Sequence, residues 1–329
     1  MRVAQVNDIA FVGSTLVRAL REEGISSELI EPARPGAGIA YPWKAVTLPL
    51  RVAGLVSAGM HVRRGGFDLA HVHYARLGLV GPIGGRPYVL HCHGSDIRGV
   101  RPRSPWGVEV APFLRGAALV YYATPDLRPW VEAFRRDSRF LPNPIEIPED
   151  AAPEEPRFDV LVGVRLHPIK GSESIASTLA AVRRLRPGTT VTIVDQGPDV
   201  PLVREAAGSP VRVIRPVPHE EMPRLLRAHR VAVGQLRLGA LGNHELEALA
   251  TGTPVATAFS FQDAYDEAPP ILEAPDPERL AALIVGLLDD EGARRALGDA
   301  GRRWVATHHG SGTIATRVAA DYRSILAGR

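Results

Sequence analysis

The sequence of 329 residues contains one cysteine, Cys92, and so cannot form an internal disulfide, which is compatible with a reducing compartment. It has no uninterrupted apolar run of the ~18 residues that a membrane-spanning helix needs. Its first residues, Met1–Val6, lack the basic segment and long apolar stretch of a secretory signal, and they read as a strand. These absences predict a cytoplasmic protein.

Lysine is also scarce, because only two of the 39 basic residues are lysine, Lys44 and Lys170. Residues 44–103 hold nine basic and two acidic residues, a balance that favours an anionic partner such as a lipid surface or a phosphorylated substrate. A solvated arginine-rich face would give the same pattern. Aromatic residues are not interleaved with these cations, which argues against a nucleic-acid partner.

Apolar runs of strand length alternate with helix-like stretches along the chain, a pattern typical of parallel sheets with helices on both faces. The first helix is expected over 14–23, with Ser14 or Thr15 near its N-cap. In such α/β folds ligands bind beyond the carboxyl ends of the strands. The expected strands are 3–6, 68–73, 87–92, 158–164, 190–194, 211–214, 231–234 and 254–258.

A proline-rich, acidic stretch interrupts this alternation at 141–156 and is typical of an interdomain linker. It predicts two α/β domains of similar size, residues 1–145 and 146–312, with a cleft between them.

The loop 163–171 follows an expected strand and holds two cations, Arg165 and Lys170, five residues apart. The loop ends in glycine and the next helix offers its amino end, so both cations can converge on one anion such as a diphosphate. Two surface cations on a turn are the alternative interpretation. Because this loop holds one of only two lysines in the chain, we favour the anion-binding interpretation.

A second, glycine-rich loop at 235–242 precedes a helix expected to open near Asn243. Its glycines permit close approach by a ligand, and the helix would direct free backbone N–H groups at a phosphate. Glu247 falls one turn into that helix, where its carboxylate can accept hydrogen bonds from a ribose diol. Tight packing also selects small residues, so this loop alone is weak evidence.

Taken together, these segments resemble the family 4 glycosyltransferases, retaining nucleotide-sugar enzymes of the GT-B fold. The resemblance covers nearly the whole chain and implies two Rossmann-like domains facing a cleft. Residues 1–145 would bind the acceptor and 146–312 the donor, and a C-terminal helix of about 313–329 would cross back onto the first domain. The resembling segments are 68–73 (D-x-x-H-x-H), 93–96 (H-G-x-D), 141–144, 163–171, 194–198, 239–255 and 276–322.

The resemblance implies a hexosyltransferase-type enzyme that moves a sugar from a UDP-, GDP- or dTDP-linked donor to a hydroxyl of a small-molecule, glycan or lipid-linked acceptor. Arg165 and Lys170 would hold the diphosphate and stabilise the leaving nucleotide, and His93 would lie beneath the transferred sugar. Glu247 would bind the donor ribose. The other implied donor contacts are Gly163, Pro198, Val217, Gly239, Leu241, Gly242 and Asn243, and the implied acceptor contacts are Gly13, Ser14, His73 and Tyr74.

One departure from the family pattern concerns the donor sugar. The pattern has a glutamate eight residues before Glu247, where this chain has Gly239. In the family that glutamate binds hydroxyls of the donor sugar, so without it the identity of the donor sugar is undetermined. Asn243 or His244 could take its place.

We expect no metal and no other cofactor, because the sequence offers no acidic cluster of the kind that holds a metal on a diphosphate. His71 and His73 share one side of a strand, but without a third ligand they read as packing or substrate contacts. Two other functions compete with the transferase. One is a nucleotide-sugar epimerase of the same architecture, which needs further acid and base carboxylates, and the other is a non-catalytic nucleotide-binding homologue, which Gly239 favours.

A membrane contact is the remaining expectation. Tyr41–Lys44, the apolar run to Met60 and the basic segment His61–Arg64 could form an amphipathic face for peripheral contact with the inner membrane surface. A crossover helix packed on its own sheet is the alternative.

Overall fold

The computed structural model describes residues 1–35, 46–148 and 155–328. The chain divides into two compact units, of which unit 1 is residues 1–144 with 311–329 and unit 2 is residues 145–310. The linker expected over 141–156 lies in part outside the described residues. Among the helices of the described ranges, none is both long and apolar enough to cross a membrane.

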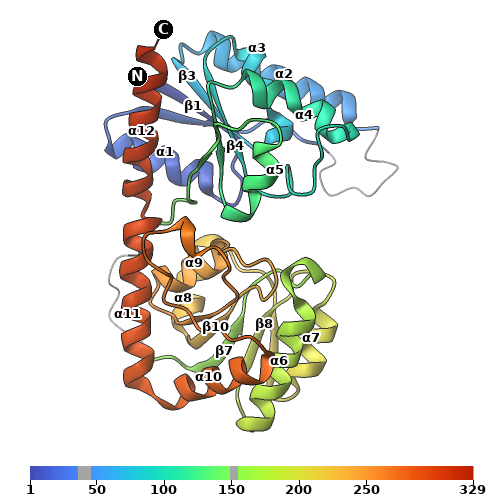
Figure 1. Cartoon of the computed structure of the whole chain (residues 1–329), viewed down its shortest axis with the longest axis vertical. Helices are drawn as coiled ribbons and strands as arrows, with labels where there is room; N and C mark the ends of the chain where they lie inside the picture. The colour runs from blue at the N-terminus through green and yellow to red at the C-terminus, as the bar shows by residue number, and fades with distance from the viewer. Residues whose placement is uncertain (36–45, 149–154, 329) are drawn as a thin grey trace. The chain divides into compact units, whose positions relative to one another are not determined.

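Unit 1 is built on a parallel sheet of six strands in the order β2-β1-β3-β4-β5-β6 (Figure 1). The inner strands β3 (Leu69–His73) and β4 (Tyr88–Cys92) are buried along their whole length, as parallel strands are when helices cover both faces. The other strands are β1 (Arg2–Val6), β2 (Ser26–Ile30), β5 (Leu119–Tyr122) and β6 (Arg139–Phe140).

Helices cover both faces of this sheet. On one face α1 (Val12–Glu22) and α12 (Ser311–Ala327) pack in one core with residues of β1, β3 and β4. Helix α12 belongs to unit 1 although it follows unit 2 in the chain. The opposite face is covered by α2 (Leu48–Arg64), α3 (Val80–Gly84), α4 (Pro105–Gly116) and α5 (Arg128–Glu132), and short 3-10 helices occur at Ala75–Leu77 and Pro125–Leu127.

The start of α1 corrects the sequence analysis, because the helix begins at Val12 and neither Ser14 nor Thr15 is its N-cap. The Asp8 carboxylate accepts a hydrogen bond from the Ser14 backbone N–H at 3.1 Å, so an upstream side chain does the work of a cap. The Ser14 hydroxyl instead donates to the carbonyl of Phe11 at 3.1 Å.

Unit 2 has a parallel sheet of five strands in the order β11-β10-β7-β8-β9. The two parallel sheets confirm the predicted α/β class. The strands are β7 (Phe158–Val162), β8 (Val191–Val194), β9 (Val211–Ile214), β10 (His229–Val233) and β11 (Val255–Ala256). The helices are α6 (Ser172–Leu185), α7 (Val200–Ala207), α8 (Met222–Arg227), α9 (Asn243–Ala250), α10 (Pro277–Asp289) and α11 (Glu291–His308), with 3-10 helices at Pro168–Lys170 (η4), His219–Glu221 (η5) and Gln262–Ala264 (η6).

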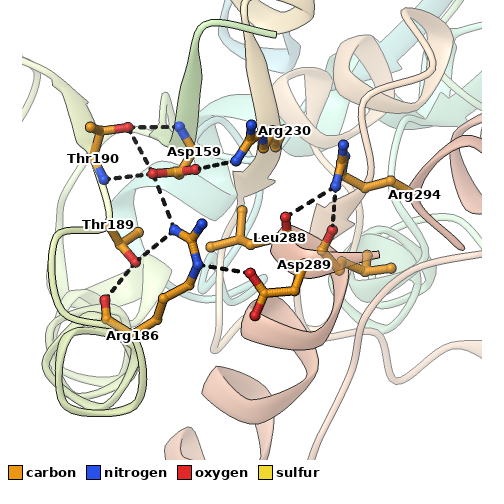
Figure 2. A network of polar contacts seen from close by, with 9 residues as sticks. Asp159, Arg186, Thr189, Thr190, Arg230, Leu288, Asp289 and Arg294 are labelled. Atoms are coloured by element: carbon orange, nitrogen blue, oxygen red, sulfur yellow. Dashed lines mark hydrogen bonds and ion pairs between the residues drawn. The ribbon is translucent and has the colours of Figure 1, made fainter. Parts of the chain in front are cut away.

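A polar network ties together the amino-terminal edge of this second sheet (Figure 2). The Asp159 carboxylate, near the start of β7, accepts hydrogen bonds from the Thr190 backbone N–H at 2.8 Å and from Arg230 at 2.9 Å. Arg186 lies 3.5 Å from the same carboxylate and donates to Asp289 at 2.9 Å. This edge of unit 2 therefore pairs its charges internally.

Candidate functional site

Three loops of unit 2 meet at the carboxyl-terminal edge of its sheet, because β10, β7 and β8 are neighbours. The loop after β7 donates the Leu166 N–H to the Gln196 carbonyl of the loop after β8, at 2.7 Å. The loop after β10 donates the Leu236 N–H to the Lys170 carbonyl at 2.9 Å. Ligands of α/β folds bind at this edge, so the sequence-predicted donor residues gather where a site is expected.

Lys170 lies beside the amino end of α9. A Cβ built on Gly242, the residue before the helix, would be 3.7 Å from the Lys170 Nζ. The same position is 3.0 Å from an oxygen of Glu245. That carboxylate is wholly buried and accepts hydrogen bonds from the N–H groups of Gly242 and Gln235 at 2.9 and 2.7 Å. The Gly242 N–H, one of the backbone donors expected to be free at this helix end, is therefore already bonded to Glu245.

Arg165 and Lys170 keep their charges free of acidic partners. Arg165 is exposed and Lys170 is half-buried, and within the described ranges neither side chain forms an ion pair or a hydrogen bond. An ammonium group next to a helix amino end adds to the positive potential of that end instead of cancelling it. Lys170 is thus placed to favour an anion, and the exposed Arg165 lies on the same loop.

Glu247 lies one turn into α9, as predicted. Burial, with a further contribution from Glu245, raises the pKa of the Glu247 carboxyl to about 7. His219, in the turn after β9, places its Nδ1 3.5 Å from a Glu247 oxygen. Val217 precedes it by two residues, so the position expected to face a nucleobase belongs to the same turn that reaches the ribose candidate.

Gln235 holds the glycine-rich loop from inside and was not singled out as a site residue. It is wholly buried, and its Oε1 accepts hydrogen bonds from the N–H groups of Arg237, Leu238 and Gly239 at 2.9, 2.6 and 3.3 Å. Its Nε2 donates to the Ala258 carbonyl at 2.7 Å. A glutamine directly after a buried strand and before a glycine-rich loop was the available signal.

Gly239 has the backbone conformation that favours glycine, with φ at 68°. A Cβ there would lie 2.6 Å from the Ser260 hydroxyl oxygen. A glutamate at this position would therefore need a different loop conformation. Of the two suggested replacements, His244 packs its ring against Gly163, where a Cβ would meet it at 2.4 Å.

The remaining donor candidates take different places. Leu241 is buried in the core beneath α9, so only its backbone can reach a ligand. Asn243 is the first residue of α9 and is half-buried. Pro198 lines a cavity of about 960 Å³ together with residues of α7 and β9.

In unit 1 the segment 93–96 is organised by Asp96, which is wholly buried. Its carboxylate accepts hydrogen bonds from the N–H groups of His93 and Gly94 at 3.0 and 2.8 Å, and from Ala75 at 2.7 Å. Burial raises the pKa of this carboxyl, although the backbone donors oppose the shift. The aspartate of the H-G-x-D motif thus fixes the backbone that carries His93.

The predicted acceptor residues in unit 1 divide into accessible and buried ones. Tyr74 is half-buried with a positive φ of 98°, a strained value for tyrosine, and its hydroxyl lies 3.1 Å from that of Ser95. Gly13 is buried, and a Cβ there would lie 2.7 Å from the Asn7 carbonyl. His73 has no exposed surface, so it cannot touch an acceptor directly.

The structure corrects the view that His71 and His73 have no third companion. His91, on the neighbouring strand, brings its nitrogen close, so that ligand atoms of the three rings lie within 4.8 Å of one another. Both nitrogens of His73 and the Nδ1 of His71 already have hydrogen-bond partners. Among the described residues, the Nε2 of His71 forms no hydrogen bond. Hydrogen bonds therefore fix the rings of His71 and His73 within this group.

These sheets and loops define an α/β protein of the GT-B fold, and solved structures confirm it. The sucrose-phosphate synthase of Thermosynechococcus elongatus has a TM-score of 0.70 and 20% identity, with 100% of both chains covered. The HepE protein of Anabaena, solved with UDP-glucose, has a TM-score of 0.66 and 16% identity, covering 98% of this chain and 100% of that one.

At the sequence level, residues 176–320 match the family model described as glycosyl transferase-like. The GDP-mannose-dependent monoacylated alpha-(1-6)-phosphatidylinositol monomannoside mannosyltransferase of Corynebacterium glutamicum is 27% identical over 216 residues. That alignment covers 57% of each chain, so this chain spans little more than half the length of the relative. The matches support the predicted enzyme class, a glycosyltransferase, whereas membership of family 4 stays a prediction.

Proposed function

We propose that this protein is a glycosyltransferase that moves a sugar from a nucleotide-diphosphate donor to an acceptor hydroxyl. The observation that carries the proposal is the Lys170 ammonium, which has no ion-pair partner among the described residues and lies beside the start of α9. Glu247 follows one turn into the same helix. A cation, a helix amino end and a half-buried carboxylate are the groups that a diphosphate and its ribose need.

The chemistry explains why a cation should stand there. When the glycosidic C–O bond breaks, negative charge grows on the diphosphate and positive charge grows on the anomeric carbon. Preorganised positive groups are among the largest sources of stabilisation for such charge. Lys170 and Arg165 would supply it, and we propose that they do so without a metal ion. Among the described residues, no cluster of three or more metal-binding side chains near Lys170 and Arg165 contains acidic groups.

Donor recognition would divide between two turns of unit 2. Glu247 would accept hydrogen bonds from the ribose diol, and the turn that holds Val217 and His219 would face the base. Ser260 occupies the space that a side chain at position 239 would need, so other groups would bind the hydroxyls of the donor sugar. Asn243, which is half-buried at the start of α9, is the candidate. The named donors of the relatives, GDP-mannose and UDP-glucose, set the first sugars to test.

The test is nucleotide release from a panel of UDP-, GDP- and dTDP-sugars, with and without EDTA, with water or simple glycosides as acceptors. We expect release from one donor, unaffected by EDTA, and a product with the anomeric configuration of the donor when it is followed by NMR. A changed sugar still attached to its nucleotide would indicate an epimerase. Binding without turnover would indicate a non-catalytic homologue.

We further propose that unit 1 touches a lipid surface through α2. Several large apolar side chains at the start of this helix and just before it are exposed, and Leu50, at 61%, is an example. Arg63 and Arg64 at its other end are exposed and cationic, which suits an anionic bilayer. The segment Tyr41–Lys44, which was expected to share this face, lies outside the described residues. The mannosyltransferase relative acts on a phosphatidylinositol lipid, which makes a lipid-linked acceptor the first class to test.

Sedimentation with vesicles that contain phosphatidylglycerol tests this contact. The double variant Leu48→Ser, Leu50→Ser should lose at least tenfold in binding while its melting temperature stays unchanged. Leu283→Ser, which removes an exposed apolar group from α10, is the matched control and should bind like the parent. Equal binding of all three proteins would contradict the proposal.

A further inference from the structure

An unbroken chain of hydrogen bonds runs from His93 into the core of unit 1. The Nε2 of His93 lies 3.2 Å from the Nδ1 of His73, and the Nε2 of His73 lies 2.8 Å from the Oε1 of Gln5. The Nε2 of Gln5 donates to the Tyr322 hydroxyl at 3.1 Å, and that hydroxyl lies 2.5 Å from the Nδ1 of His71. Every member except His93 is wholly buried.

The register of the sheet explains why these polar groups meet. Gln5 of β1 is paired with His71 of β3, and His73 of β3 is paired with His91 of β4. Paired residues of adjacent strands point to the same face, so these side chains share the face that α12 covers. Tyr322 reaches them from α12.

The direction of each hydrogen bond follows from the chemistry of its partners. A glutamine Oε1 can only accept, so the Nε2 of His73 must carry a hydrogen. Burial lowers the pKa of His73 to about 3, so the ring is neutral and its Nδ1 holds a lone pair. The Nε2 of His93 must therefore donate to it. Burial also lowers the pKa of His93 well below its usual value, which leaves the Nδ1 of this neutral ring as an acceptor.

We propose that Gln5 and His73 are positioning residues that hold His93 as the tautomer protonated on Nε2, so that its Nδ1 accepts a hydrogen bond from a hydroxyl of the bound sugar. The tautomer itself follows from the side chains of unit 1. Only the role at the sugar rests on the proposed glycosyltransferase function.

The tautomer can be measured without any substrate. Long-range ¹H–¹⁵N correlation spectra of protein labelled with ¹⁵N-histidine distinguish a ring protonated on Nε2 from one protonated on Nδ1. The His93 signals are assigned by their loss in His93→Gln. We expect the Nε2-protonated form in the parent protein. An Nδ1-protonated His93 would mean that the Gln5 amide is reversed, and it would overturn the proposal.

Variants at Gln5 test the cause. Gln5→Leu removes the acceptor for His73, which should then move its proton to Nδ1 and force His93 into the other tautomer. Gln5→Glu keeps an acceptor and should keep the parent tautomer. Tyr322→Phe breaks the chain beyond Gln5 and is the matched control, with His93 unchanged. If Gln5→Leu does not fold, Gln5→Met removes the same acceptor. An unchanged His93 in the folded variant would overturn the proposal.

A bound metal ion is a distinct outcome of the same study. Elemental analysis of protein purified without chelators should find no stoichiometric transition metal. One ion per chain that is lost in His91→Leu would show that ring nitrogens of His71, His73 and His91 are metal ligands. That result would overturn the hydrogen-bonded chain.

Turnover then tests the role at the sugar. With the donor found in the panel, Gln5→Leu should lower kcat at least tenfold while the KM for the donor stays within twofold, and Gln5→Glu should restore kcat. An unchanged kcat in Gln5→Leu would overturn this role. If the parent protein turns over no nucleotide-sugar, the proposed function fails, whereas the spectra still decide the tautomer.

Discussion

The cations at the two edges of the unit 2 sheet differ in whether they have acidic partners. At the amino-terminal edge, Arg186 and Arg230 are paired with Asp159 and bonded in a network (Figure 2). At the carboxyl-terminal edge, Arg165 and Lys170 have no acidic partner within the described ranges. Among the described residues, one sheet thus carries cations with acidic partners at one edge and cations without them at the other.

The difference separates charges that serve the fold from charges that would serve a ligand under the proposed function. A cation without a counterion adds no ion-pair stabilisation to the unliganded protein and stays available to a bound anion. Paired cations at the other edge contribute to stability and leave nothing for a ligand. Changes at the two edges should therefore have opposite signatures, one in activity and the other in stability.

The largest effect is expected for Lys170→Ala. Loss of a preorganised cation beside the diphosphate should lower turnover by about 100-fold or more, on the order of 3 kcal/mol in the transition state. The free energy of unfolding should change little, because this side chain has no hydrogen-bond or ion-pair partner among the described residues. Nucleotide release and urea unfolding measure the two quantities. Arg303→Ala, which removes an exposed cation of α11, should leave both unchanged.

Asp159→Asn should show the reverse signature. It leaves Arg230 and Arg186 without their shared carboxylate and weakens the bonds to Thr190, so we expect a loss of about 2 kcal/mol in the free energy of unfolding. Nucleotide release at a temperature where the variant is folded should stay within twofold of the parent.

Asp289→Asn is the control for this network, since Asp289 is 61% exposed and its ion pair should contribute less than ~1 kcal/mol. Equal losses in the two variants would contradict the idea that the buried member holds the edge together.

Glu247→Gln sharpens the comparison through pH. The folded-state pKa of about 7 lies above the unfolded value of 4.5, so folding favours the protonated carboxyl. The parent is then fully stable with respect to this group below pH ~4.5 and loses stability as the pH rises through ~7. Relative to the parent, the variant should gain about 3 kcal/mol in unfolding free energy between pH 4.5 and pH 8.

Urea unfolding at several pH values measures this gain. A constant difference for Glu247→Gln would show that its carboxyl is ionised in the free protein.

The smallest effect is expected for Gly239→Ala, at about 1–2 kcal/mol in the free energy of unfolding. The cause is the positive φ together with the close approach of the Ser260 hydroxyl. Ser260→Gly should recover the part due to the contact when both changes are combined, and a double-mutant cycle of thermal unfolding separates the two parts. No recovery would mean that the backbone strain alone sets the cost.

The sequence was sufficient for the α/β class, for most strands and for the loop that carries Arg165 and Lys170, because these depend on local apolar periodicity and glycine placement. It did not reveal that His73 is buried or that His91 joins His71. Those facts depend on strand register, which brings together residues that are far apart in the chain. Gln235 and Glu245 were missed for a related reason, since a buried polar side chain is recognised only once its backbone partners are placed.

The return of the chain into unit 1 has a consequence for synthesis on the ribosome. Tyr322 and its neighbours on α12 fill the core over β1, β3 and β4, yet they are translated after all of unit 2. The first sheet therefore emerges with the part of one apolar face that α12 covers still exposed, while unit 2 can close as soon as residue 310 has left the exit tunnel. In this protein the half that is made first is finished last.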